Sequence, residues 1–225
     1  RTDFGDIRFT DDDGITELDY WIEEYTSSDE AIFWIEIADN LDSNQVIYLY
    51  YGNNDVSSVS NGEDTFLFFD DFDDGDFDTS IWTWYRLDGS FSESGGILHS
   101  STSSGELNQL CSEDSLGWTG NVAFRSRLKT DEQDNTEVGF DERHDGVVTG
   151  EYLDNARGQH RNSTKFYHVG EDEGNTGSTA ERTSTWTSYS IFEIQWLGRG
   201  SDGSTEFYDG DTLDAIIANV TLHHL

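Results

Sequence analysis

Alternation of apolar and polar residues is the dominant pattern along this chain. It is clearest in residues 122–128 (VAFRSRL) and 190–196 (SIFEIQW). A two-residue period is typical of β-strands because successive side chains point to opposite faces of a sheet, whereas the 3.6-residue period of helices is nearly missing. The pattern therefore predicts an all-β protein.

The first part of the chain carries four strand-like segments, at residues 7–9, 20–22, 31–37 and 45–51. Clusters of Asp, Gly and Asn separate them and indicate turns. A Ser- and Asn-containing stretch at residues 57–61 is the best candidate for a linker. We therefore expect a small β-sandwich domain at residues 1–64.

The remainder, residues 65–225, is expected to form a second domain. Short strand-like segments recur there with Gly-containing turns between them, and Asp209-Gly210 after Phe207-Tyr208 is a hairpin signal. Short strands at this spacing predict an antiparallel sandwich. The fold class predicted for the whole chain is two all-β domains in tandem.

The charge of the chain bears on its environment and its partners. The formal net charge is -35, from 47 acidic and 12 basic residues. Such a surface repels itself at ordinary ionic strength, whereas at molar salt the Debye length falls to roughly 3 Å and the repulsion is screened. Adaptation to concentrated brine is the simplest explanation, with calcium loading and a polycationic partner as alternatives. Nucleic acid and anionic membranes are disfavoured, because both require a basic surface.

Composition limits the remaining options. Aromatic residues make up 14% of the chain, so a packed core is feasible although only 34% of residues are hydrophobic. The single cysteine, Cys111, excludes an internal disulfide, and no apolar run reaches the length of a membrane span. Asn162 and Asn219 begin triplets that match the glycosylation acceptor pattern, which supports an extracellular or cell-surface location.

An ordered run of motifs in residues 3–61 resembles the domain of unknown function family 2341. The motifs are Asp6-Ile7-Arg8-Phe9-Thr10, Tyr20-Trp21-Ile22-Glu23, Ala31-Ile32-Phe33-Trp34 and Ile47-Tyr48-Leu49-Tyr50-Tyr51-Gly52-Asn53. The resemblance implies a bacterial or archaeal surface or secreted protein. The family is usually found beside carbohydrate-active or adhesive modules and has no established activity.

Residues 66–220 resemble a concanavalin A-like, or laminin-G-like, jelly roll. The motifs are Phe69-Asp70-Asp71-Phe72, Asp78-Thr79-Ser80-Ile81-Trp82, Gly95-Gly96-Ile97-Leu98, Tyr189-Ser190-Ile191-Phe192-Glu193-Ile194 and Phe207-Tyr208-Asp209-Gly210. The resemblance implies a fold that is common among lectins.

Both resemblances lack strands that their families normally have. The first family begins with further strands before Asp6, and the jelly roll ends with one or two strands after Val220. Open sheet edges are liabilities unless something pairs with them. Two explanations remain: the chain is a piece of a longer one, or a neighbouring subunit donates the strands by β-strand addition.

Catalysis is not expected. Jelly-roll glycosidases of the laminarinase type carry Glu-x-Asp-x-Glu on one strand, and this run is absent. The nearest carboxylates, Glu137 and Asp141, would lie about 13 Å apart on one strand. A retaining pair requires roughly 5–5.5 Å and an inverting pair roughly 6.5–9.5 Å. We therefore assign no catalytic residues.

The densest group of carboxylates, Asp70, Asp71, Asp73 and Asp74, is the candidate metal site. Oxygen ligands in a turn suit calcium, and related jelly rolls often hold a structural calcium near this edge. The alternative is a solvated acidic turn, which we favour slightly in so acidic a chain. No cofactor other than calcium is expected.

Aromatic residues are the candidate ligand-binding groups, because flat rings present apolar faces to the C–H groups of a pyranose. We assign this role to Trp84 and Tyr85, with Tyr152 and Trp186. A second set is expected to form the core of the first domain, namely Tyr20, Trp21, Phe33, Trp34, Tyr48 and Tyr50.

The function expected from these features is that of a non-catalytic, extracellular or cell-surface module for glycan binding or adhesion in a salt-adapted organism. Its partner would be a polysaccharide or a glycoprotein surface. The first alternative is a structural subunit of a filament, sheath or virion assembled by strand exchange. The second is a glycoside hydrolase or lyase.

Overall fold

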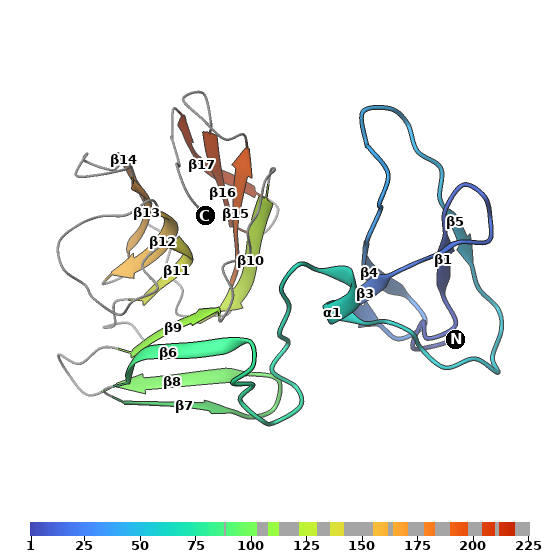
Figure 1. Cartoon of the computed structure of the whole chain (residues 1–225), viewed down its shortest axis with the longest axis horizontal. Helices are drawn as coiled ribbons and strands as arrows, with labels where there is room; N and C mark the ends of the chain where they lie inside the picture. The colour runs from blue at the N-terminus through green and yellow to red at the C-terminus, as the bar shows by residue number, and fades with distance from the viewer. Residues whose placement is uncertain are drawn as a thin grey trace. The chain divides into compact units, whose positions relative to one another are not determined.

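The computed structural model confirms a nearly all-β, antiparallel protein (Figure 1). It describes residues 1–87, 89–102, 108–112, 122–129, 136–141, 155–161, 164–170, 178–182, 190–197, 204–209 and 212–218. Side chains are described in residues 1–84, 89–101, 110–112 and 122–129, and at Gly139 and Ile194. None of the described residues forms a helix of the length and apolarity that a bilayer crossing requires.

Contacts between residues divide the chain into two compact units. The first unit comprises Arg1–Phe77 and Phe91–His99, and the second comprises Asp78–Ser90 and Ser100–Leu225. Residues 65–77 therefore pack with the first unit. A division into domains after residue 64 stays a prediction.

The first sheet of the first unit has three strands in the order β2-β1-β5. They are β1 (Arg8–Thr10), β2 (Glu17–Leu18) and β5 (Tyr48–Tyr50). Phe9 in the middle strand lies opposite Leu18 on one side and Leu49 on the other. The turn from β1 to β2 is held by Asp13, whose Oδ1 accepts hydrogen bonds from the backbone N–H groups of Ile15 and Thr16, both at 2.8 Å.

A hairpin of β3 (Tyr20–Thr26) and β4 (Glu30–Ile35) supplies the other half of the core. The alternation of its residues directs Tyr20 and Phe33 toward Ile7 and Phe9. The ring of Phe9 meets those of Tyr20 and Phe33 edge to face, with centroids 5.2 and 5.4 Å away. Aromatic pairs prefer this geometry because the ring edge is positive and the ring face negative. Tyr20 and Phe33 are core residues, as predicted.

The opposite face of the hairpin carries a second aromatic cluster. Trp21 and Trp34 lie opposite each other in the ladder, and both are half-buried. Phe66 and Phe69 pack on Trp21 edge to face, with centroids 5.8 and 4.9 Å away. Trp21 and Trp34 are therefore packed, as predicted, but against Phe66 and Phe69 and not in the central core.

A short helix positions these phenylalanines. Helix α1 (Gly62–Thr65) begins after Asn61, whose side chain caps it by accepting from the N–H of Glu63 at 3.0 Å. The backbone N–H of Asn61 donates to the carbonyl of Tyr20 at 2.9 Å. The stretch predicted to be a linker is thus fastened along strand β3.

The prediction that Tyr48 and Tyr50 are core residues is wrong. Their side chains are 46% and 47% exposed. They lie opposite Thr10 and Arg8, so they share the face of the sheet that points away from Phe9. Both tyrosines lie on an edge strand of three residues and stay about half exposed, although Thr10 on the same face is buried.

Two antiparallel pairs follow the first unit's main sheet and hairpin. Strand β6 (Trp82–Leu87) pairs with β9 (Asn108–Ser112), and β7 (Gly89–Glu93) pairs with β8 (Leu98–Thr102). Cys111 lies in β9 opposite Thr83 and is half-buried. Trp82 is also half-buried.

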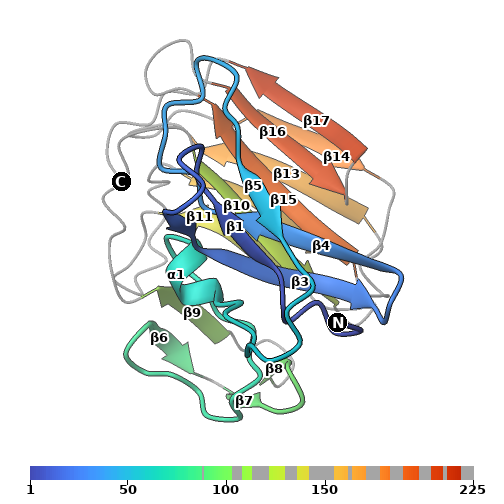
Figure 2. The same ribbon diagram turned by 90° about the vertical axis from the view of Figure 1, so that its right-hand side faces the viewer.

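The second unit holds two four-stranded antiparallel sheets (Figure 2). One has the order β10-β15-β16-β17 and comprises β10 (Val122–Leu128), β15 (Ser190–Leu197), β16 (Ser204–Asp209) and β17 (Thr212–Ala218). The other runs in chain order through β11 (Thr136–Asp141), β12 (Asn155–Arg161), β13 (Thr164–Gly170) and β14 (Ser178–Arg182).

These two sheets form a sandwich-like arrangement. Strand β15 pairs with β10, although all four strands of the other sheet lie between them in the sequence. Strand β12 contacts β15, and β14 contacts β17. Ile194 of β15, opposite Phe124 and Phe207, is fully buried. The arrangement agrees with the predicted antiparallel sandwich, whereas a concanavalin A-like jelly roll stays a prediction.

Candidate functional site

Trp84 is the one predicted ligand-binding residue whose side chain the structure describes. It lies in β6 opposite Leu110 of β9, and 43% of it is exposed. A bulge follows directly, between Trp84 and Arg86, and bulges redirect the side chains beside them. Part of Trp84 is therefore accessible to a ligand.

The side chains of the other three predicted ligand-binding residues are not among those described. The backbone of Tyr85 lies in β6, but its side chain is not among those described. Tyr152 and Trp186 lie outside the described residues. A platform of four aromatic residues therefore stays a prediction.

A second exposed aromatic pair, which the sequence interpretation assigned to the core, lies on strand β5. Tyr48 and Tyr50 occupy alternate positions on one face of the strand. The hydroxyl group of Tyr50 reaches across β1 and donates to the carbonyl of Gly14 at 3.3 Å. Tyr51, the next residue, is 78% exposed. Alternation alone does not distinguish an exposed edge strand from a buried one, which is why this pair was missed.

The acidic segment around Asp70 is a succession of turns in which carboxylates accept from nearby backbone N–H groups. Asp70 accepts from Phe72 at 2.8 Å, Asp74 from Asp76 at 2.9 Å and Asp78 from Ser80 at 2.7 Å. Among the described residues, no three Asp, Glu, His or Cys side chains are arranged to hold a metal ion. These bonds stabilise the turns, and a calcium site in the segment stays a prediction.

Two carboxyl groups of this region have raised pKa values. Burial raises the pKa of Asp71, and the neighbouring charge of Asp73 raises it further. Burial also raises the pKa of Glu93, with additional contributions from Asp74 and Asp70, although the N–H of Gly75 donates to Glu93 at 2.9 Å and opposes the shift. Like charges held close together disfavour ionisation. Protonation therefore relieves repulsion in this segment.

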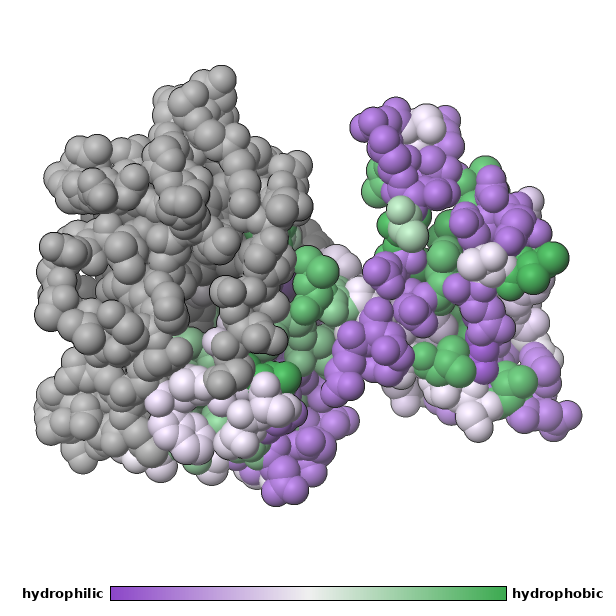
Figure 3. All heavy atoms as spheres, in the orientation of Figure 1, coloured by the Kyte–Doolittle hydropathy of each residue, from purple (hydrophilic) through white to green (hydrophobic). Residues whose placement is uncertain are grey.

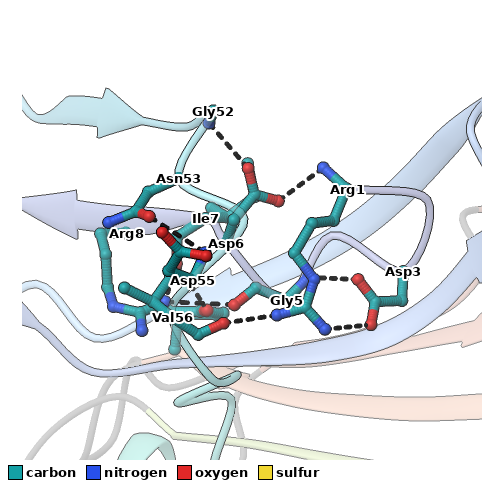
Figure 4. A network of polar contacts seen from close by, with 11 residues as sticks. Arg1, Asp3, Gly5, Asp6, Ile7, Arg8, Gly52, Asn53, Asp55 and Val56 are labelled. Carbon is teal, nitrogen blue, oxygen red and sulfur yellow. Dashed lines mark hydrogen bonds and ion pairs between the residues drawn. The ribbon is translucent and has the colours of Figure 1, made fainter.

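A network of polar contacts centres on Asp6 (Figure 4). The Asp6 side chain is buried, with 1% exposed. Its Oδ1 accepts from the N-terminal ammonium group of Arg1 and its Oδ2 from the backbone N–H of Gly52, both at 2.7 Å. These two donors, the ammonium group first, lower the pKa of Asp6 to about 2.

Arginine side chains complete the network. Arg8 donates to the carbonyls of Ser57 and Ile7, both at 2.6 Å, and Arg1 donates to the carbonyl of Val56 and to Asp3. The segment that follows β5 is thus bonded to Asp6, just before β1, through Gly52, and to Arg8 of β1 through Ser57. The sequence does show polar residues, Asp6 and Arg8, among apolar neighbours. Their bonds to Gly52 and Ser57 span 46 and 49 residues, however, and a local pattern cannot reveal such pairs.

The remaining sequence-based assignments lie where side chains are not described. Asn162 and Asn219 are outside the described residues. Glu137 and Asp141 occupy strand β11, opposite Gln159 and Asn155, and only their backbone is described. The separation of about 13 Å expected for their carboxylates stays a prediction.

Comparison with known proteins gives one family match. No curated protein and no solved structure matches the chain. The matched segment extends beyond the motifs that suggested it and includes Phe66 and Phe69, which pack on Trp21, and also the Asp78–Trp82 motif that suggested a jelly roll. Residues 3–85 of the 225-residue chain are similar to the family described as Domain of unknown function (DUF2341).

Proposed function

We propose that this chain is a non-catalytic, extracellular or cell-surface module that binds glycans in a salt-adapted organism. The observation that carries the proposal is the exposure of Trp84, a tryptophan that is 43% exposed on a two-stranded sheet. Sugar rings stack on tryptophan because their C–H groups meet the negative face of the aromatic ring. The family matched by residues 3–85 has no stated activity.

Charge narrows the class of glycan. The net charge of -35 opposes the approach of sulfated or uronic-acid polysaccharides, even though molar salt weakens the repulsion. Figure 3 shows hydrophilic residues interrupted by apolar ones over one face of the first unit. A neutral polysaccharide, or the neutral glycans of a surface glycoprotein, therefore fits best.

The test is binding to a panel of neutral and anionic polysaccharides in 2 M NaCl. We expect binding to a neutral member and at least about tenfold weaker binding by Trp84→Ala, which corresponds to about 1.4 kcal/mol. Leu67→Ala is the matched control, because Leu67 is an apolar residue with 75% exposure. Absence of binding to every polysaccharide, or equal binding by both variants, would contradict the proposal.

A second candidate function is that of a structural subunit assembled by strand exchange. The specific observation in its favour is strand β5, which lies at the edge of its sheet with all three residues exposed.

A further inference from the structure

Strand β5 is an exposed sheet edge without charged residues, proline or a bulge. It ends the order β2-β1-β5, and among the described residues no strand pairs with its other edge. Leu49 is 48% exposed although it points to the same face as the buried Phe9. Both faces of β5 are thus exposed, and so is the row of backbone N–H and C=O groups along its outer edge.

Monomeric proteins protect such edges with charged residues, proline, bulges or very short strands. Residues 45–54 contain no Asp, Glu, Lys, Arg or Pro, in a chain of which 26% is charged. The described ladder between β1 and β5 also runs without a bulge. By contrast, β2 at the opposite end of the sheet has two residues, one of them Glu17. The edge formed by β5 is also short, with three residues, but it carries no charged residue, proline or bulge.

The strand is also held in place before any partner arrives. Its C-terminal end is fixed by the bond from Gly52 to the buried Asp6, and its outer face by the bond from Tyr50 to Gly14. Pre-organisation of this kind reduces the entropy lost on binding.

We infer that β5 pairs antiparallel with β5 of a second copy of this chain, with Leu49 on the two-fold axis. This register places Leu49 opposite Leu49, Tyr48 opposite Tyr50 and Ile47 opposite Tyr51. Every directly opposed pair is apolar or aromatic, and such cross-strand pairs stabilise a sheet. The two three-stranded sheets become one continuous sheet of six strands.

The register follows from the alternation of faces. Directly opposed side chains lie on the same face of a sheet. A shift of one residue would place Leu49 of one copy, which points to the core side, opposite a tyrosine of the other copy, which points to the outer side. The cores of the two copies would then lie on opposite faces of the joined sheet. Leu49 is the middle residue of the three-residue strand, so centring on it pairs the whole strand. A two-fold axis makes the contact self-complementary and closes the assembly at two copies.

The charge of residues 45–54 indicates which kind of strand pairs with β5. A basic partner would find no carboxylate along residues 45–54, and the nearby carboxylate of Asp6 is already bonded to Gly52. An uncharged strand with exposed apolar residues is the complementary partner, and β5 itself is such a strand. Repulsion between two chains of charge -35 must be screened, so the pairing requires high salt. A few residues from each copy form far less than the roughly 20–30 of a standard interface, so the dimer is weak.

The first test is sedimentation velocity of the whole chain in 2 M NaCl over a hundredfold range of concentration. We expect a concentration-dependent dimer that Leu49→Lys weakens at least tenfold and that Leu67→Lys leaves unchanged. The control makes the same substitution at an apolar residue with 75% exposure. A wild-type chain that stays monomeric at millimolar concentration, or equal dimerisation of both variants, would overturn the inference.

The second test reads the register directly, by oxidation with copper–phenanthroline in a Cys111→Ser background. Leu49→Cys should cross-link with itself, since directly opposed Cβ atoms in such a pair lie about 4.5–5.5 Å apart. Tyr48→Cys and Tyr50→Cys should cross-link only when mixed with each other. Self-linking of the two tyrosine variants without linking of Leu49→Cys would overturn this register. Dimers that persist in Leu49→Lys would reject this pairing while leaving the second candidate function open through another surface. Neither test depends on glycan binding.

Discussion

The ring of Phe69 lies against Gly62 so closely that a Cβ atom on Gly62 would come within 2.3 Å of it. Gly62 is buried at the start of helix α1, and Phe69 in turn packs on Trp21 with centroids 4.9 Å apart. The absence of a side chain at Gly62 therefore allows the segment after the helix to cover the outer face of the β3–β4 hairpin.

Gly62→Ala should destabilise the first unit by about 1–3 kcal/mol, because an added methyl group in a packed site forces the neighbours apart. The free energy of unfolding is measured by chemical denaturation in 2 M NaCl. Phe69→Leu removes the opposing ring atoms, so the double variant should cost less than the sum of the two single variants. Additive effects would contradict the steric explanation.

Tyr20→Phe should cost about 0.5–1.5 kcal/mol, the net worth of one hydrogen bond. The Tyr20 hydroxyl, on a residue with 1% exposure, donates to the carbonyl of Ile7 at 2.8 Å, and after the substitution that carbonyl keeps only the bond from Arg8. Tyr50→Phe is the matched control. It removes an exposed hydroxyl group that donates at 3.3 Å, and it should change the free energy of unfolding by less than about 0.5 kcal/mol.

Tyr20 should also make stability depend on alkaline pH. Burial raises the pKa of Tyr20 above its ordinary value of 10.0. A raised pKa in the folded state gives a contribution that is complete below pH 10 and is lost as the pH rises through the folded-state value. Thermal unfolding of wild type and Tyr20→Phe between pH 9 and 11 should show the smaller alkaline loss in the variant, and parallel losses would contradict this assignment.

Asp6 should make the first unit sensitive to acid. Its pKa is lowered from 3.8 to about 2, so its contribution is complete above pH 3.8 and is lost as the pH falls toward 2. Asp6→Asn should be less stable at neutral pH and should lose less stability between pH 5 and 2. Tryptophan fluorescence during acid titration measures this as the difference between Asp6→Asn and wild type, since all seven tryptophans contribute to the signal. Asp12→Asn, at an exposed residue, is the control. An unchanged acid profile in Asp6→Asn would contradict the prediction.

Salt should stabilise the chain by screening its own charge. With a net charge of -35, the melting temperature should rise from tens of millimolar to molar NaCl as the Debye length shortens from roughly 10 Å at 0.1 M to roughly 3 Å at 1 M.

The carboxylates of Asp70 and Asp74 are bonded within their own turns. At matched ionic strength we therefore expect CaCl2 to stabilise no more than MgCl2. Selective stabilisation by calcium that Asp70→Asn and Asp71→Asn abolish would instead establish a calcium site.

Much of the local structure could be predicted from the sequence. The expected segments at residues 7–9, 20–22, 31–37, 45–51, 122–128 and 190–196 overlap β1, β3, β4, β5, β10 and β15. Turn residues such as Asp13 also act as expected, through bonds to backbone groups two and three residues away. These features are local, since the period of the pattern and the chemistry of a turn are contained within a few residues.

The candidate site could be predicted only in part. Trp84 is exposed as its proposed role requires, but alternation gave equal reason to place Tyr48 and Tyr50 in the core. The distinction depends on whether another strand or helix covers that face of the sheet, and a covering element is not encoded in the strand itself.

The sequence by itself determined that this is an antiparallel all-β protein and which residues alternate along each strand. Only the tertiary structure decided that Phe66 and Phe69 cover Trp21, that Asp6 is buried against Gly52, and that β5 is an edge. The physical reason is that a side chain's orientation follows from the backbone of its own strand. Its burial follows from contacts with residues far away in the sequence, which form only when the whole unit has folded.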